Sequence, residues 1–341
     1  MSDFPLLSEL QQAGQRLMIG FDGTELDDPL KYAIDTLHVG GLILFRRNIE
    51  APDQVTELCA AAQAYAAACG QPPLFIAIDQ EGGKVARLRP PFTQFPGNPA
   101  MRSLQDAIDF ARITAGELRR AGVNMNMAPV LDVLPVHGES VMCDRAFGND
   151  PGWVAQMGCT VIEHLQKNGI MAVAKHFPGI GRTVLDSHCD LPDLDIDLQA
   201  LTGRDLVPFR AAVTACVSGV MLSHIRYLRY DQNWPASLSP RIADTLLRGE
   251  MGFDGLILTD DLDMGAVARH YDIQTAAGQC LLAGVDLLLI CHAGPSIQAA
   301  FDTIVRLNRT SEELARKSAR SLRRIAELKQ FYLTRTIETE I

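Results

Sequence analysis

The stretch GLILTDDLDM, from Gly255 to Met264, is an apolar run of strand length that breaks abruptly into two adjacent acids, Asp260 and Asp261. A second stretch, IMAVAKHFPGIGRTVLDSHCDLPD at residues 170–193, breaks in the same way at a Lys-His pair. Charged side chains at the end of a buried strand are typical of α/β enzymes, because loops above a rigid sheet hold reactive groups in a cleft. Both stretches therefore indicate a parallel sheet with a functional site at its strand ends.

The same alternation of strand-like and helix-like segments extends along the whole chain. Apolar runs of strand type occur at 16–21, 41–45, 74–79, 123–132, 171–176, 219–224, 256–260 and 285–290. Helical stretches lie between them at 53–69, 103–121, 151–168, 201–216, 239–251 and 272–283. Near-continuous apolar strands suit a parallel sheet that is covered on both faces, and this number of repeats predicts a (β/α)8 TIM-type barrel.

The alternative fold is a doubly wound open sheet, but no Gly-rich phosphate-binding sequence follows the first strand. No linker or shift in composition divides the 341 residues, so we expect a single domain over residues 1–341. Its last element is predicted to be an amphipathic helix at about 310–330, with a capping box formed by Thr310 and Glu313. Leu314, Leu322, Ile325 and Leu328 share one face of this helix, and its Arg and Lys residues are expected to be solvated.

Composition limits the partners and the location. A net charge of −10 argues against general nucleic-acid binding, which needs a basic surface. No apolar run reaches the length of a membrane span, and the N-terminus lacks the features of a signal peptide. We therefore predict a cytoplasmic monomer that binds neither membranes nor nucleic acid. The cysteines show no CxxC spacing and are expected to be free, and mostly buried, thiols (Cys59, Cys69, Cys216, Cys280, Cys291).

Ionisable side chains follow nearly every predicted strand. They are Asp22, Arg46, Arg47, Asp79, Asp132, Lys175, His176, His224, Asp260, Asp261 and His292. In a barrel these residues meet at one rim, where active sites form. Polar residues also mark where strands stop, but that does not explain why so many are charged. A charged cleft without an aromatic lining or a phosphate-binding loop fits a small hydroxylated substrate such as a sugar.

Asp186 and His188 form a second signal within that rim. Residues two apart on an extended segment project to the same side, so the carboxylate can reach the imidazole. Such a carboxylate fixes the tautomer of the ring and leaves its other nitrogen free for proton transfer. The surrounding loop, residues 178–193, is long and contains Gly179 and Gly181, which suits closure over a ligand. The alternative is a surface turn in which the two side chains pair locally.

Several motifs, taken together, resemble the family 3 glycoside hydrolases, in particular the single-domain bacterial β-N-acetylglucosaminidases of peptidoglycan recycling. The resemblance runs from about Leu17 to about Ile290. Its landmarks are IDQEGGKVARLR (78–89), MAPVLDV (127–133), DRAFGNDP (144–151), KHFPGIGRTVLDSHCDLP (175–192), VMLSHI (220–225), PASLSP (235–240) and GFDGLILTDDLDMGAV (252–267).

The resemblance implies a role for each candidate residue. The nucleophile of the family falls on Asp260, and the acid/base falls on His188, which Asp186 orients. The sugar-binding positions fall on Asp79, Arg87, Arg145, Lys175 and His176. No metal or cofactor is expected. The implied reaction is retaining removal of terminal N-acetylglucosamine from 1,6-anhydro-muropeptides, a small-molecule substrate. The residues alone do not choose between Asp260 and Asp261; the resemblance does.

Two features depart from the family pattern. Relatives carry Gly-His-Gly where this chain has Ile180 between two glycines, which bears on how the loop packs. Many relatives also have a second domain that supplies the acid/base, whereas this sequence ends near the last barrel helix, which favours His188. Because a His acid/base does not repel phosphate, a β-N-acetylglucosaminide phosphorylase remains an alternative, as does a β-glucosidase of the same family.

Other classes remain open from the residues. A metal-dependent barrel hydrolase would use His176, His188, His224 and Asp260 as ligands. A Schiff-base lyase would use Lys175 at its strand end. A sugar-binding barrel without activity is the third alternative.

Overall fold

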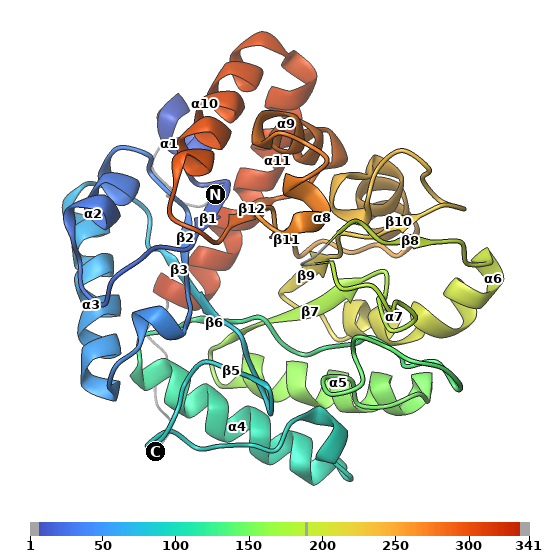
Figure 1. Ribbon diagram of the computed structural model, residues 1–341. Helices are drawn as coiled ribbons and strands as arrows, with labels where there is room; N and C mark the ends of the chain where they lie inside the picture. The colour runs from blue at the N-terminus through green and yellow to red at the C-terminus, as the bar shows by residue number, and fades with distance from the viewer. Residues whose placement is uncertain (1–6, 188–189, 335–341) are drawn as a thin grey trace.

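The structure is a computed structural model that describes residues 7–187 and 190–334. Its centre is a closed barrel of eight parallel strands in the order β1-β12-β11-β9-β7-β6-β3-β2 (Figure 1). Helices surround this barrel, so the predicted (β/α)8 fold is confirmed. The barrel strands are β1 (Leu17–Ile19), β2 (Gly41–Leu44), β3 (Phe75–Ile78), β6 (Met125–Asn126), β7 (Met171–Phe177), β9 (Gly219–Leu222), β11 (Leu256–Asp261) and β12 (Leu287–Ile290).

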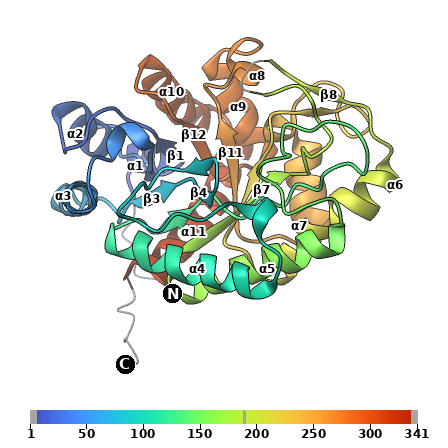
Figure 2. The same ribbon diagram turned by 60° about the horizontal axis from the view of Figure 1, so that its bottom comes forward.

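The connections hold the helices and two short two-stranded sheets, β4 (Gln80–Gly82) with β5 (Val85–Ala86) and β8 (Asp193–Leu194) with β10 (Arg226–Tyr227). The α-helices are α1 (Glu9–Gly14), α2 (Asp28–Asp35), α3 (Pro52–Ala68), α4 (Leu104–Arg120), α5 (Pro151–Lys167), α6 (Leu198–Ala200), α7 (Val207–Thr214), α8 (Gly265–Ala268), α9 (Ile273–Ala283), α10 (Pro295–Thr310) and α11 (Glu312–Lys329). The 3-10 and π-helical segments are η1 (Arg46–Asn48), η2 (Asn98–Ala100), η3 (Leu201–Asp205), η4 (Ala236–Leu238), η5 (Arg241–Glu250) and η6 (Gln330–Thr334). Neighbouring helices such as α4 and α5 pack side by side around the barrel (Figure 2).

Two predicted elements differ from the structure. The strand expected at 123–132 is regular only over β6, because Pro129 has no N–H to donate to a ladder. The segment still follows β7, where Lys175 N donates to the Pro129 carbonyl at 3.1 Å. The helix expected at 201–216 is divided into η3 and α7, and Pro208 stands in the first turn of α7.

Two layers of apolar side chains explain why the strands are continuously apolar. Leu256 and Leu258 of β11 belong to the cluster that fills the barrel. Ile257, between them, belongs to the larger cluster that also contains helix residues. Successive residues of a strand point to opposite faces. When both faces are covered, all of these residues are buried and the strand is apolar throughout.

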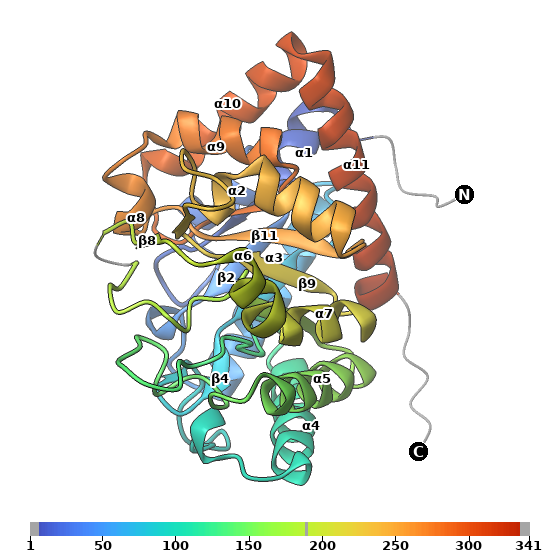
Figure 3. The ribbon, with the colours of Figure 1, turned by 90° about the vertical axis from the view of Figure 1, so that its right-hand side faces the viewer.

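The C-terminal helix begins one residue later than predicted. Ser311 is its N-cap and accepts from Leu314 N, whereas Thr310 ends α10 and donates its hydroxyl to the Arg306 carbonyl. The predicted capping box is therefore wrong. Helix α11 lies on the far side of the barrel from α8 and β8 (Figure 3), and its residue Ile325 joins the cluster that fills the barrel.

One basic residue of α11, Lys329, is fully buried, which corrects the expectation of a solvated basic face. Its Nζ donates to Gln15 Oε1 at 2.6 Å and to the Gly40 carbonyl at 2.9 Å, and it lies 4.9 Å from the centre of the Phe75 ring. Burial lowers the pKa of this ammonium to about 7. The folded protein therefore releases a proton here that the unfolded chain keeps up to its ordinary lysine pKa.

This buried lysine predicts a pH-dependent stability. Between pH 7 and the ordinary lysine pKa of 10.5, the unfolded state binds one more proton at Lys329 than the folded state does, so its contribution to stability rises with pH. One such proton changes the free energy of unfolding by at most about 1.4 kcal/mol per pH unit. Urea unfolding of the wild type and of Lys329→Met at several pH values between 7 and 9 measures the effect. The free energy of unfolding of the wild type should rise relative to that of the variant as pH rises. If the two free energies change with pH in parallel, the assignment to Lys329 is refuted.

The cysteines are free at all seven positions that the structure describes (Cys59, Cys69, Cys143, Cys159, Cys216, Cys280 and Cys291). Burial is confirmed for Cys59, Cys280 and Cys291, but Cys69 is only partly buried and Cys216 is exposed. Within residues 7–187 and 190–334, no helix has the length and apolar character needed to cross a membrane.

Candidate active site

A cavity of about 340 Å³ opens at the carboxyl ends of the barrel strands. Its lining contains the predicted sugar-binding residues together with both candidate acids of β11 and the loop residue Asp186 (Asp79, Arg87, Arg145, Lys175, His176, Asp186, Asp260, Asp261). The predicted acid/base, His188, lies outside the described residues. Residues far apart in the sequence thus converge at the rim where such barrels carry their active sites.

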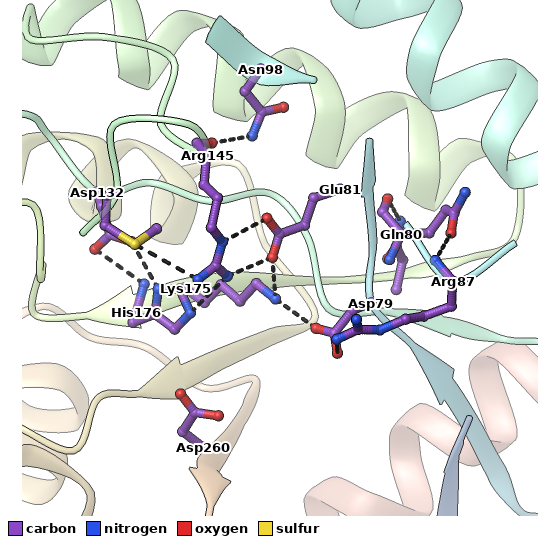
Figure 4. Close-up of polar contacts among 12 residues, drawn as sticks. Asp79, Gln80, Glu81, Arg87, Asn98, Asp132, Arg145, Lys175, His176 and Asp260 are labelled. Carbon is purple, nitrogen blue, oxygen red and sulfur yellow. Dashed lines mark hydrogen bonds and ion pairs between the residues drawn. The ribbon is translucent and has the colours of Figure 1, made fainter. Parts of the chain in front are cut away.

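Lys175 is the centre of a buried charge network on one wall of the cavity (Figure 4). Its Nζ lies 2.7 Å from Asp79 Oδ1 and 2.6 Å from Glu81 Oε1, and its side chain is only 2% exposed. Arg145 binds Glu81 through two nitrogens, at 2.7 and 3.0 Å. Arg87 donates to the other oxygen of Asp79 at 3.1 Å. Each buried charge therefore has an opposite partner.

The protonation states in this network follow from its pairing. Burial would raise the pKa of the Asp79 and Glu81 carboxyls, but Lys175 and the two arginines hold both pKa values below their usual range. Burial likewise opposes the charge on Lys175, yet the two carboxylates raise its pKa above that of an ordinary lysine. The two carboxylates and the Lys175 ammonium therefore remain charged near neutral pH, so the wall offers both donors and acceptors to a polar ligand.

Asp132 positions His176 on this wall. Its Oδ2 lies 2.8 Å from His176 Nδ1, and its Oδ1 accepts from Ile180 N at 2.7 Å. His176 Nε2 lies 3.3 Å from Arg145 Nη2. One fully buried carboxylate therefore fixes both a cavity imidazole and the start of the following loop.

The two acids at the end of β11 have different surroundings. Burial would raise the pKa of Asp260, but His176 and the Asp261 N–H, 2.8 Å from Asp260 Oδ1, hold it below its usual value. Burial raises the pKa of Asp261, whose Oδ1 accepts from two backbone N–H groups at 3.0 Å each. Asp261 thus holds the backbone, whereas Asp260, whose pKa is kept low, faces the wall of Lys175 and His176 (Figure 4).

His224 supports the end of β11 from behind. Its Nε2 lies 2.9 Å from the Asp261 carbonyl, which only accepts, so Nε2 carries the proton. Its Nδ1 lies 2.7 Å from the Ser237 hydroxyl. Burial lowers the pKa of this ring, so it remains a neutral donor that orients the strand end.

The loop after β7 begins tightly packed. A Cβ on Gly181 would lie 2.1 Å from the Val133 carbonyl oxygen, so only glycine fits there. Gly179 has a φ of 124° and its carbonyl accepts from the Tyr227 hydroxyl at 2.8 Å. Ile180, which replaces the histidine of the family pattern, is buried and lines the cavity, and its backbone N–H still binds Asp132. The base of the loop is therefore held through backbone contacts.

Known proteins that are similar to this chain show the family to which it belongs. Residues 9–327 match the model of the glycosyl hydrolase family 3 N-terminal domain. The chain belongs to glycosyl hydrolase family 3. The resemblance expected from the motifs, and with it the prediction of a glycoside hydrolase, is confirmed.

Similar proteins carry related names. A β-hexosaminidase of Nitrosomonas eutropha is 38% identical over 285 residues, which cover 81% of this chain and 80% of that protein. A family 3 β-N-acetylglucosaminidase from Paenibacillus sp. superposes with a TM-score of 0.92 at 38% identity, covering 95% of this chain. The present chain spans 62% of that Paenibacillus chain. A β-N-acetylhexosaminidase from Beutenbergia cavernae superposes with a TM-score of 0.86 at 30% identity and is covered over 98% of its length.

Some rim residues of this family 3 chain do not line the cavity. Asp22 is exposed and pairs with Arg47 at 3.1 Å, while Arg47 also donates to the Phe21 carbonyl. His292 is exposed beside Asp261 and Asp263. These side chains hold neighbouring loops together instead of facing the cavity.

The geometry argues against the other reaction classes. A Schiff base needs a neutral amine, but Lys175 is held as an ammonium by two carboxylates. Within the described part of the chain, the residues spaced to hold a metal ion are Asp261, Asp263 and His292. That group contains neither His176 nor His224, whose ring nitrogens have the protein partners given above.

Sequence reasoning missed the role of Glu81. The residue lies within the IDQEGG motif, but no function was assigned to it. The signal was present, because Asp79 and Glu81 are two apart on an extended segment and project to the same side. The same spacing argument was applied to Asp186 and His188.

Proposed function

We propose that this protein is a retaining exo-β-N-acetylglucosaminidase that removes a terminal, non-reducing N-acetylglucosamine from 1,6-anhydro-muropeptides during cell-wall recycling. The observation that carries the proposal is the ionised Asp260 carboxylate facing a wall of paired charges across one cavity. The family and the names of its relatives support the hexosaminidase class. A cavity of about 340 Å³ is at the small end of ligand pockets, which suits one sugar ring.

In the first step, the terminal sugar binds with its hydroxyls on Asp79, Arg87 and Lys175. An Asp260 oxygen attacks the anomeric carbon as the glycosidic bond breaks, and His188 gives its proton to the leaving oxygen. The products are a glycosyl ester on Asp260, a released aglycone and a neutral His188. Because charge pairs fix the binding side chains, the anomeric carbon is held close to the nucleophile without further ordering.

In the second step, His188 takes a proton from water, and the hydroxyl oxygen attacks the anomeric carbon from the side that the aglycone left. The ester bond to Asp260 breaks, and N-acetylglucosamine leaves with its β configuration retained. A histidine suits both steps, since its ordinary pKa near 6.5 allows it to give and take protons at neutral pH. We propose that the enzyme acts in the cytoplasm, as a monomer without metal or cofactor.

The acid/base assignment predicts a dependence on the leaving group. In His188→Ala, turnover of poor leaving groups should fall at least about 100-fold, whereas aryl leaving groups with a low pKa need little protonation and should lose far less in the bond-breaking step. Asp186→Asn should change activity in the same direction, because a neutral amide no longer stabilises the imidazolium. Steady-state kinetics with a series of aryl N-acetyl-β-glucosaminides measures this. Equal losses for all leaving groups would assign the pair a structural role.

The substrate assignment is tested by comparing N-acetyl-β-glucosaminides with plain β-glucosides that share one aglycone. Loss of the acetamido group leaves its polar partners unpaired, so kcat/KM should fall by at least about 100-fold. Equal rates on both would exclude the recycling role and favour a β-glucosidase. Repeating the assay with added phosphate separates hydrolysis from phosphorolysis: formation of N-acetylglucosamine 1-phosphate would make the protein a phosphorylase.

A further inference from the structure

The loop after β7 is fastened on both sides of residues 188–189 to one short segment. On one side, the Ser187 carbonyl accepts from Ala266 N at 3.0 Å. On the other side, Asp190 Oδ1 lies 2.6 Å from His270 Nε2. Ala266 belongs to α8 and His270 follows it closely, so both contacts come from the segment directly after β11.

That segment is itself hydrogen-bonded to the strand that carries Asp260. Met264 N donates to the Asp261 carbonyl at 3.1 Å, and His270 N donates to the Val267 carbonyl at 3.0 Å. Ala266 and Val267 are buried. The position of His270 is therefore set by the end of β11, and the Asp190 contact transmits that position to the loop.

Asp190 is also bonded to the backbone of the loop, so its contact with His270 bears on the position of the loop. Its Oδ1 also accepts from Leu191 N at 2.8 Å, and its own N–H donates to the Asp186 carbonyl at 3.3 Å. The hydrogen bond from His270 is the largest cause that holds the pKa of Asp190 below its usual value, so the carboxylate is an acceptor near neutral pH. Asp190 thus links His270 to the backbone on both sides of itself.

We propose that His270 is a positioning residue for the acid/base half of the reaction, acting through Asp190 on the loop that carries Asp186. The inference rests on the proposed function, because it concerns how that reaction protonates its leaving group. His270 is 41% exposed and Asp190 is 53% exposed, so the pair contributes little to global stability. Its effect is on geometry, since a small displacement of an acid relative to its acceptor is costly in rate.

The test compares His270→Ala with the wild type on N-acetyl-β-glucosaminides with poor and with activated leaving groups. For poor leaving groups, kcat should fall about 5- to 50-fold, whereas KM and the rate of the bond-breaking step on activated substrates should change less than about 3-fold. His270→Gln keeps an N–H donor at similar reach and should recover most of the loss. A uniform loss across leaving groups, or no loss at all, would overturn the proposal.

A matched control lies further along the same chain. Asp195 pairs with Arg229 at 2.5 Å, and the two side chains are 55% and 62% exposed, but this pair lies outside the segment 187–190. Asp195→Asn should leave all rates near those of the wild type; a leaving-group-dependent loss there would overturn the specific role of His270. Different results would contradict the proposed function itself. These are a wild type that does not hydrolyse the activated N-acetylglucosaminide, or a His188→Ala variant without leaving-group dependence.

Discussion

Replacing Asp260 with asparagine should lower kcat on every N-acetyl-β-glucosaminide by at least about 10³-fold while sugar binding persists. The amide has the same shape but does not attack the anomeric carbon, and the paired charges around Lys175, which we propose bind the sugar, are unchanged. Inhibition or calorimetry with N-acetylglucosamine measures binding, and steady-state kinetics measures turnover. The same Asp-to-Asn change at the neighbouring acid provides the control.

Asp261→Asn is that control. Its Oδ1 accepts from two backbone N–H groups, and an amide oxygen at the same place still accepts from both. We therefore expect a loss below about 10-fold for Asp261→Asn. The reverse order, with Asp261→Asn inactive and Asp260→Asn active, would contradict the assignment of the nucleophile.

Lys175→Met should cost both stability and activity. The variant leaves Asp79 and Glu81 buried without their shared cation, and breaking a buried pair in this way costs about 3–5 kcal/mol. Activity should fall by at least about 10³-fold, because a donor proposed to bind the sugar is lost and the pKa values of both carboxyls rise without the ammonium. Chemical denaturation and kinetics on the same preparation measure the two effects.

A double variant separates the two losses. Lys175→Met with Glu81→Gln removes one of the stranded carboxylates, so stability should recover by about 1–3 kcal/mol while activity stays low. Recovery of activity together with stability would mean that Lys175 only maintains the fold. No recovery of stability would show that Glu81 is held mainly by Arg145, which binds it through two nitrogens.

The barrel was predictable because its strands are buried on both faces and therefore appear as unbroken apolar runs. The exceptions are places where one residue overrides the pattern. Pro129 shortens the fourth strand, and Pro208 divides a helix that looked continuous. Lys329 was assigned to solvent because an amphipathic pattern shows which face is apolar but not how deeply a single lysine is enclosed.

The site was predictable to the extent that charge follows strand ends. Asp79, Lys175, His176 and Asp260 all line the cavity. The pairing among them was not predictable, since it depends on which strands are neighbours in the closed barrel and how their registers align. The surroundings of Asp261 show this, because its Oδ1 accepts from the backbone N–H of Cys291, thirty residues further along the chain.

A covalent bond between Asp260 and the sugar can be detected directly by labelling the enzyme. The wild type is incubated with a 5-fluoro derivative of an N-acetyl-β-glucosaminide with a good leaving group, digested, and mapped by mass spectrometry. We expect one added sugar per chain, on the peptide that contains Asp260, with fragment ions that place it on that residue. A label on Asp261 or elsewhere, or turnover through the substrate's own acetamido group with no labelled enzyme, would contradict it.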